Sequence, residues 1–294
     1  MLSMNVVTGA LELGFIYALV AMALFLSFRV LNIADMTTDG SFTLGCAVSA
    51  VLAVAGHPIL GIPLAMLAGA AAGFITALLQ TRLGVPSILA GIITNTGLYT
   101  VNLAVMGFSA NVNMLKTDTI FSMFRNLLGG AAVYKLILAA AIAAVVCVLL
   151  ILFLRTRLGL SIRATGDNPD MVRASSINTR VTVTIGLCAA NAVTALSGAI
   201  LAQYQKTADI NLGTGMVIIG ETIFGRGGIP LKVVGAVAGS VIYRFIIAVA
   251  LRLNLPAECL KLISAVIVAL AIALPYLRQQ HKSRPRADRT ERSV

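Results

Sequence analysis

The sequence predicts an all-α, polytopic membrane protein with about eight or nine transmembrane helices. Of its 294 residues, 59% are hydrophobic and 11% are charged, whereas a soluble domain carries about 25% charged residues. The apolar residues form long continuous runs, without the period-two alternation of a membrane β-barrel. With a mean hydropathy of +0.95, the chain has too little polar surface to fold in water.

The net charge of +11 reflects membrane topology. Basic residues gather near the ends of predicted spans and in the C-terminal tail, mostly on one side, which is the bias of cytoplasmic loops. That side includes Arg29, Arg82 and the segment 155–180. The C-terminus is therefore expected in the cytoplasm and the N-terminus outside, and no nucleic-acid partner is expected.

The spans of the first half are separated by polar residues. The first is expected to close at Arg29, and the second to begin near Thr37 or Asp39, where Ser, Thr or Asp can cap a helix. This second span looks short and broken near its start. The expected bounds are 6–28 for the first span, 59–79 for the third and 86–106 for the fourth, with a turn at 56–58 and an inside loop at 80–84.

The second half opens with a polar loop over 107–130, followed by a fifth span that ends near Leu154. After the segment 155–180 and a turn at 203–213, the remaining spans are expected at 181–202, 214–224 and 233–251, with a last one ending at Pro275. Residues 1–277 thus form one membrane domain. The basic tail 278–294 is expected to be disordered and cytoplasmic.

Two short segments share a pattern. ADMTTDGSFTLG (34–45) and ADINLGTGMVIIG (208–220) each begin with Ala-Asp and then place two glycines five positions apart. In the expected topology they cross the membrane in opposite directions. Such a pair is typical of an inverted repeat whose broken helices line a transport path.

Polar residues inside predicted spans are candidates for that path. Asn95, Tyr99 and Asn102 recur at spacings of four and three, so they share one face of a helix. There they either line the path or hydrogen-bond to a neighbouring helix. The candidate path residues are Asp39, Ser41, Asn95, Tyr99, Asn102 and Glu221.

The acidic candidates also have structural interpretations. Glu221 lies in a short apolar span, where an ionisable group suggests function but can also serve as an ion-pair partner. Asp35 and Asp39 either gate a path near the cytoplasm or cap the second helix. The alternative partners are Arg226 or Arg244 for Glu221, and Arg29 for Asp35 and Asp39.

No pattern in the sequence predicts catalysis or a metal site. There is no phosphate-binding loop and no GxSxG turn, so the chain is not expected to be an enzyme. The cysteines lie in apolar segments of the sequence without CxxC pairs, and the two histidines are isolated. These residues are Cys46, Cys147, Cys188, Cys259, His57 and His281.

The strongly polar segment 163–179, RATGDNPDMVRASSINT, lies between two long apolar runs. Asp167 or Asn168 can cap a helix, Pro169 suits the first helical position, and Asp170 suits the positive end of the helix dipole. A short cytoplasmic helix is expected here, running to about Ser176. It is either an ordinary basic loop or a docking element for a soluble partner.

This segment resembles the coupling loop of ABC importer permeases of the branched-chain amino acid and ribose type. The resemblance rests on Gly159, Arg163-Ala164, Gly166 to Pro169, Arg173 to Ser175 and Ile177-Asn178. Three further stretches are similar to the permeases of tryptophan and tyrosine uptake within that group. They are FRVLNIADMTTDGSFTLG, GIITNTGLYTVNLAVMG and LSGAILAQYQKTADINLGTGMVIIG.

The resemblance implies a homodimeric pore in the plasma membrane. It would work with a cytoplasmic ATPase dimer and an extracytoplasmic solute-binding protein that delivers an amino acid, aromatic ones being favoured. The ATPase would bind ATP and Mg, and this chain would hold no cofactor. The residues implied in coupling to the ATPase are Arg163, Gly166, Asp167, Asn168, Pro169, Asp170, Met171 and Arg173.

Two other classes of function remain open from the residues. One is an ion-coupled secondary transporter or channel that uses Glu221, Asp39 or Glu12. The other is a membrane scaffold or enzyme, which no feature of the sequence favours.

Overall fold

The computed structural model describes residues 4–127, 133–210 and 228–252. Within these ranges, six helices are long and apolar enough to cross a membrane, and a further apolar helix is shorter. The prediction of an all-α, polytopic membrane protein is confirmed. The spans expected at 214–224 and up to Pro275 lie outside the described residues, as do Glu221 and the tail 278–294.

The first span combines the helix α1 (Met4–Leu24) with a π-helical turn η1 (Phe25–Val30). The Ser27 hydroxyl donates to the carbonyls of Ala23 (3.4 Å) and Leu24 (3.3 Å), and such bonds compete with the regular helix ladder. The other elements are α2 (Thr38–Val54), α3 (Pro58–Thr81), α4 (Ser87–Val105), β1 (Asn111–Asn113), α5 (Ile120–Leu127), α6 (Tyr134–Arg155), α7 (Arg157–Asp167), α8 (Pro169–Ala174), α9 (Thr179–Gln205), β2 (Thr207–Asp209) and α10 (Ile229–Arg252).

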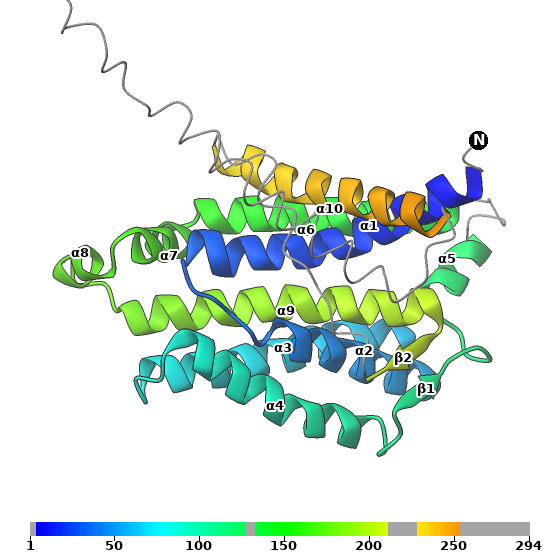
Figure 1. Ribbon diagram of the computed structural model, residues 1–294, viewed down its shortest axis with the longest axis horizontal. Coiled ribbons are helices and arrows are strands. Elements are labelled where there is room, and N and C mark those ends of the chain that lie inside the picture. Colours follow the sequence, from blue (N-terminus) through cyan, green and yellow to red (C-terminus); the bar gives the residue numbers. More distant parts are fainter. Residues whose placement is uncertain (1–3, 128–132, 211–227, 253–294) are drawn as a thin grey trace, which may run out of the picture.

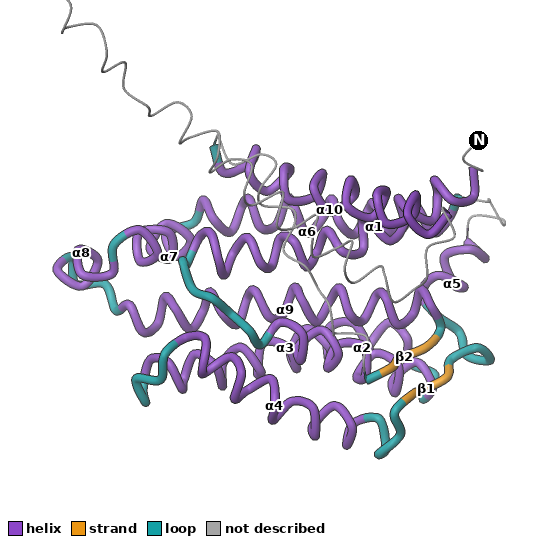
Figure 2. Tube along the Cα trace, in the orientation of Figure 1, coloured by secondary structure: helices purple, strands orange, loops and turns teal. Residues whose placement is uncertain are grey.

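Helix α9 is the centre of the arrangement. It lies between α1, α6 and α10 on one side and α2, α3 and α4 on the other (Figure 1). Figure 2 shows that α7 and α8 project at one end of the bundle, whereas β1, β2 and α5 lie at the opposite end. The two ends therefore present different surfaces on the two sides of a membrane.

Small residues allow the helices around α9 to approach closely. A Cβ atom placed on Gly45 would overlap the Ala195 carbonyl, and one on Gly69 would meet the Asn191 carbonyl at 2.5 Å. A Cβ on Gly198 would overlap the backbone of α2. In a bilayer, helices associate through such close packing because lipid is as apolar as their side chains.

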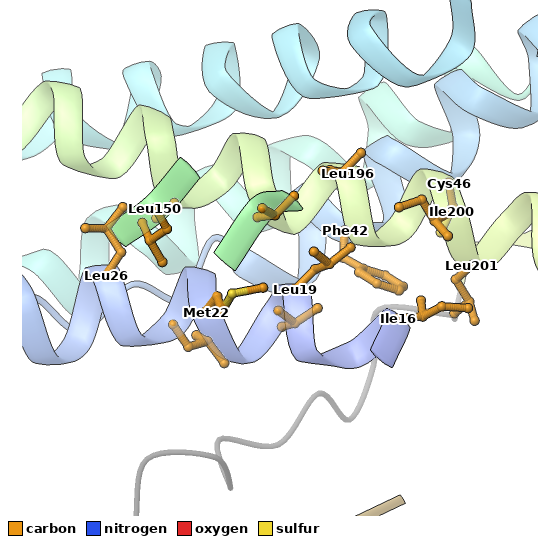
Figure 3. Packing of buried hydrophobic residues seen from close by; sticks show 14 of the residues in the cluster. Ile16, Leu19, Met22, Leu26, Phe42, Cys46, Leu150, Leu196, Ile200 and Leu201 are labelled. Carbon is orange, nitrogen blue, oxygen red and sulfur yellow. The ribbon is translucent and has the colours of Figure 1, made fainter. Parts of the chain in front are cut away.

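Larger side chains fill the space between α1, α2 and α9. Figure 3 shows Leu19 and Met22 of α1 near Phe42 of α2, with Leu196 and Ile200 of α9 on the other side. All five side chains are buried. This cluster fixes α1 against the rest of the bundle.

Helix α2 begins in the middle of the bundle. The loop 31–37 leads from the end of η1 back to the start of α2 (Figure 1), and Ser41 near that start donates to Asn191 in the middle of α9. The expectation of a short second span, broken near its beginning, is confirmed. Its supposed repeat, 208–220, lies almost entirely outside the described residues.

Two loops differ from the expectation. The polar loop 107–130 contains strand β1 and helix α5, and β1 pairs antiparallel with β2. The turn expected from residue 203 begins later, because α9 extends to Gln205. The Gln203 amide donates to Ser49 Oγ and to the Pro58 carbonyl, both at 2.9 Å, which secures the last turn of α9.

Candidate functional site

The segment 155–180 folds into two helices rather than one helix in a loop. Thr156 caps α7 by accepting from Gly159 N at 3.1 Å. Asn168 caps α8, accepting from the backbone of Asp170 (3.1 Å) and Met171 (3.0 Å). Of the two capping residues that the sequence allowed, Asn168 serves α8, whereas Asp167 ends α7.

Helix α8 is short because the chain turns sharply after it. It ends at Ala174, two residues before Ser176, where the end was expected, since Ser176 has a φ of 62° and a left-handed residue cannot continue a helix. Pro169 occupies the first turn, as its fixed φ allows. Val172 is buried and anchors α8, whereas Met171 is 69% exposed at the tip.

The α7–α8 hairpin is held directly against the first span. A Cβ atom on Gly166 would overlap the Val30 carbonyl at the end of η1. The hydroxyls of Thr165 on α7 and Thr182 on α9 share a 2.8 Å hydrogen bond. The base of the hairpin therefore contacts both the end of the first span and α9.

Charged side chains of the hairpin remain largely in solvent. Arg173 donates to Asp170 at 3.4 Å and to the Thr179 hydroxyl at 3.2 Å, while Arg163 is half-buried. Beside α8 lies a cleft of about 610 Å³ that contains two arginines. It is lined by Arg173, Ser176, Ile177, Asn178, Thr179 and Arg180.

A second group of polar residues lies within the membrane bundle, at the start of α2. Asp35 is 1% exposed and accepts from Thr37 N at 2.9 Å, as in an Asx turn, and from Asn191 Nδ2 at 2.7 Å. Ser41 donates to Asn191 Oδ1 at 2.6 Å. The partner considered for Asp35, Arg29, is thus replaced by an amide and a backbone N–H.

Asp39, in the first turn of α2, differs from Asp35, which lies just before that helix. Its side chain is half-buried, and within the described residues its carboxylate makes no hydrogen bond or ion pair. Asp39 is therefore an available charge at the start of a broken helix, where the positive helix dipole favours an anion.

The polar stripe of α4 is divided between two environments. Asn102 is 2% exposed and donates to the Gly40 carbonyl at 3.2 Å, and Asn95 lies beside Gly40. Tyr99 is 56% exposed on the outer face. Of the three residues, two therefore contact α2 and one faces away from the bundle.

Sequence reasoning missed the residue that connects this group, Asn191. A single amide in the middle of an apolar span was the available signal, since such a side chain needs partners in a bilayer. Thr37 precedes α2 as expected, but its side chain does not cap the helix; its hydroxyl shares a 2.8 Å hydrogen bond with that of Thr76, which the sequence did not indicate. No three His, Cys, Asp or Glu side chains come together anywhere in ranges 4–127, 133–210 and 228–252.

The far end of the bundle contains a smaller cluster. The Tyr204 hydroxyl donates to the Glu12 carboxylate at 2.7 Å, and the Lys135 ammonium lies 4.8 Å from the centre of the Tyr204 ring. Glu12 is thus bound to the end of α9, which gives it a structural role.

Comparison with known proteins gives one consistent assignment. The family model described as "Branched-chain amino acid transport system / permease component" matches residues 6–275. The chain is 30% identical to a protein named "Tyrosine transport system permease protein" of Clostridioides difficile (strain R20291), over 92% of this chain and 91% of the relative. It is 33% identical to an uncharacterised protein of Rickettsia prowazekii (strain Madrid E), over 76% of this chain and 78% of that relative.

No solved structure matches the chain. The family match nevertheless includes the broken helix α2, the α7–α8 hairpin and the central helix α9. The chain therefore belongs to the family of permease components of branched-chain amino acid transport systems.

Proposed function

We propose that this chain forms the path by which an amino acid, with aromatic ones favoured, crosses the plasma membrane in an ATP-driven importer. Membership of the family makes the chain a permease subunit of an ABC importer, a transporter rather than an enzyme. The name of the Clostridioides difficile relative, a tyrosine transport permease, supports an aromatic substrate. An ion-coupled transporter is not favoured.

The α7–α8 hairpin carries the proposal. It projects from one end of the bundle (Figure 1), exposes Met171 at its tip, and packs through Gly166 on the end of η1. A projecting tip with a rigid base is suited to receive a movement and pass it to the spans. The partner that supplies the movement is a cytoplasmic ATPase dimer, which binds ATP and Mg.

Charge on the hairpin supports the same partner. The cleft beside α8 carries Arg173 and Arg180, and a second cleft, of about 420 Å³, adds Arg82. Together they favour a partner surface with carboxylates. The arginines also favour a cytoplasmic location for this end. With one further span up to Pro275, as the sequence predicts, the C-terminus is proposed to lie in the cytoplasm too. The opposite end, with β1, β2 and α5, is then available to the solute-binding protein.

The outer face of α4 supports a second copy of the chain as a partner. Thr96, Tyr99 and Thr100 are exposed there, and a Cβ on Gly97 would meet no atom within 4 Å. Helix α4 also exposes Ile and Leu, as α3 and α6 do, but its exposed residues include these hydroxyls and Gly97 in addition. Among the six long spans of the described part, α4 has the lowest mean hydropathy, 1.4. Hydroxyls and glycine on a membrane helix favour contact with protein over lipid.

The path itself is proposed to follow the start of α2. Asp39 and Ser41 lie on α2, and Asn95 and Asn102 contact it from α4, whereas Tyr99 lies on the outer face of α4, away from this path. Broken helices near the middle of the membrane are typical of transport paths. Glu221, outside the described residues, completes the proposed set.

Reconstitution of the complete importer in proteoliposomes tests the proposal. Replacing 166–170 with a flexible linker is expected to abolish ATP-dependent uptake and ATPase association while the chain still inserts into the membrane. Because Gly166 also packs on Val30, Met171→Glu gives a milder variant that changes only the exposed tip, and Ser175→Ala serves as its control. Uptake by the permease alone, driven by an ion gradient without ATP, would contradict the proposal.

A further inference from the structure

Helices α1 and α10 cross at unusually short range. A Cβ atom on Gly14 would lie 3.0 Å from Val241 Cα, and the Ser240 hydroxyl donates to the Gly14 carbonyl at 2.9 Å. The two helices run antiparallel (Figure 1). Because helical side chains slope towards the N-terminus of their own helix, long side chains beyond this crossing point towards one another.

This crossing brings a cation onto an aromatic ring. The Arg244 guanidinium carbon lies 3.5 Å from the centre of the Tyr17 ring, and the Tyr17 ring stacks on Phe42 with centroids 6.1 Å apart. Tyr17 lies near the midpoint of the candidate span Val6–Val30. Arg244 is therefore a charge held deep in the membrane, where charged side chains are costly and usually functional.

No carboxylate of the described residues neutralises Arg244. Glu12 accepts from Tyr204, and Asp35 accepts from Asn191 and Thr37. Asp39 makes no ion pair within ranges 4–127, 133–210 and 228–252. The Arg244 Nε atom is buried without a hydrogen-bond partner there. The Nε–H group thus lacks an acceptor among the described residues and is a donor for an anion.

We propose that Arg244 binds the carboxylate of the transported amino acid at mid-membrane. A guanidinium stacked on a ring keeps its N–H groups in one plane, and that plane matches the two oxygens of a carboxylate. The cation–π contact holds Arg244 in place when no substrate is present. This inference rests on the proposed function, because only an amino acid or similar acid supplies the carboxylate.

The competing role is structural, with Arg244 paired to Glu221 as the sequence suggests. The two roles differ in the complete importer. With Arg244→Gln, the substrate-binding role predicts that uptake falls roughly tenfold to a hundredfold, as expected for loss of charge-assisted hydrogen bonds, while assembly and ATP hydrolysis stimulated by the binding protein persist. Because Glu221 belongs to the proposed path, Glu221→Gln lowers uptake by itself, and the double variant Arg244→Gln/Glu221→Gln is expected to transport no better than Arg244→Gln.

The structural role predicts different results. The double variant Arg244→Gln/Glu221→Gln would recover the uptake that Arg244→Gln loses, which would overturn the proposal. Arg244→Met tests folding separately, because it keeps the length of the side chain without burying an amide. Failure of both Arg244 variants to assemble, or wild-type uptake by either, would also overturn it. Absence of ATP-dependent uptake by the wild-type importer would instead refute the proposed function.

Discussion

Asn191, in the middle of α9, donates a 2.7 Å hydrogen bond to the Asp35 carboxylate, which lies 156 residues earlier in the chain. The same amide accepts from Ser41 on α2 at 2.6 Å. A single side chain therefore connects the loop before the broken helix, the helix itself and the central span. This connection fixes the depth at which α2 begins.

Asn191→Ala is expected to destabilise the protein by about 2–3 kcal/mol, because it leaves one oxygen of a buried carboxylate and a buried hydroxyl without partners. The thermal unfolding midpoint of the purified chain in detergent measures the effect. Thr184→Ala on the same helix is the control, since its hydroxyl bonds only to the Arg180 carbonyl of its own helix. Equal midpoints for the two variants would contradict the interpretation.

Asp35→Asn and Asp39→Asn form a matched pair with opposite expected results. An amide at position 35 directs N–H groups towards a donor, either Thr37 N or Asn191 Nδ2, so the yield of folded protein is expected to fall. Position 39 lacks a partner within the described residues, so Asp39→Asn is expected to fold normally and to lower uptake. Yield is measured by size-exclusion chromatography in detergent, and uptake in proteoliposomes. Normal uptake with Asp39→Asn would remove Asp39 from the path.

Gly166→Ala is expected to weaken the base of the α7–α8 hairpin, because the added methyl group would overlap the Val30 carbonyl. Overpacking of this kind costs about 1–3 kcal/mol, and ATPase activity stimulated by the binding protein is expected to fall with it. Gly9→Ala is the control, since a Cβ there meets no atom within 4 Å. If Gly166→Ala leaves both the unfolding midpoint and the stimulated ATPase activity unchanged, the hairpin does not act through Val30.

The sequence was sufficient for features that depend on local chemistry. Apolar runs located the long spans, and the Asn-Pro-Asp order located α8, because caps and prolines act within a few residues. The family resemblance, read from short motifs, is confirmed by a match to residues 6–275. Residue roles in coupling and in the path remain predictions.

Features that depend on distant contacts could not be predicted. Asn191 acquires its role from Asp35 and Ser41, and Arg244 from Tyr17 on another helix. The strands β1 and β2 are only three residues long, which is too short for an alternating pattern to be recognised in the sequence. These contacts form only when the helices pack together, and that packing depends on glycines spread over several spans.

The outer face of α4 gives the last prediction. If two copies meet there, Gly97→Cys is expected to form a disulfide-linked dimer in membranes under mild oxidation, because glycine positions allow backbones to approach closely. The four native cysteines are first replaced by alanine. The fold is expected to tolerate this change even at the fully buried position of Cys46, because alanine is also small and apolar. Phe74→Cys is the matched control, because Phe74 is 50% exposed on α3, among the apolar residues expected to face lipid. Non-reducing gel electrophoresis measures the linked fraction. Cross-linking at position 74 but not at 97 would place the second copy on α3 and contradict the assignment of α4.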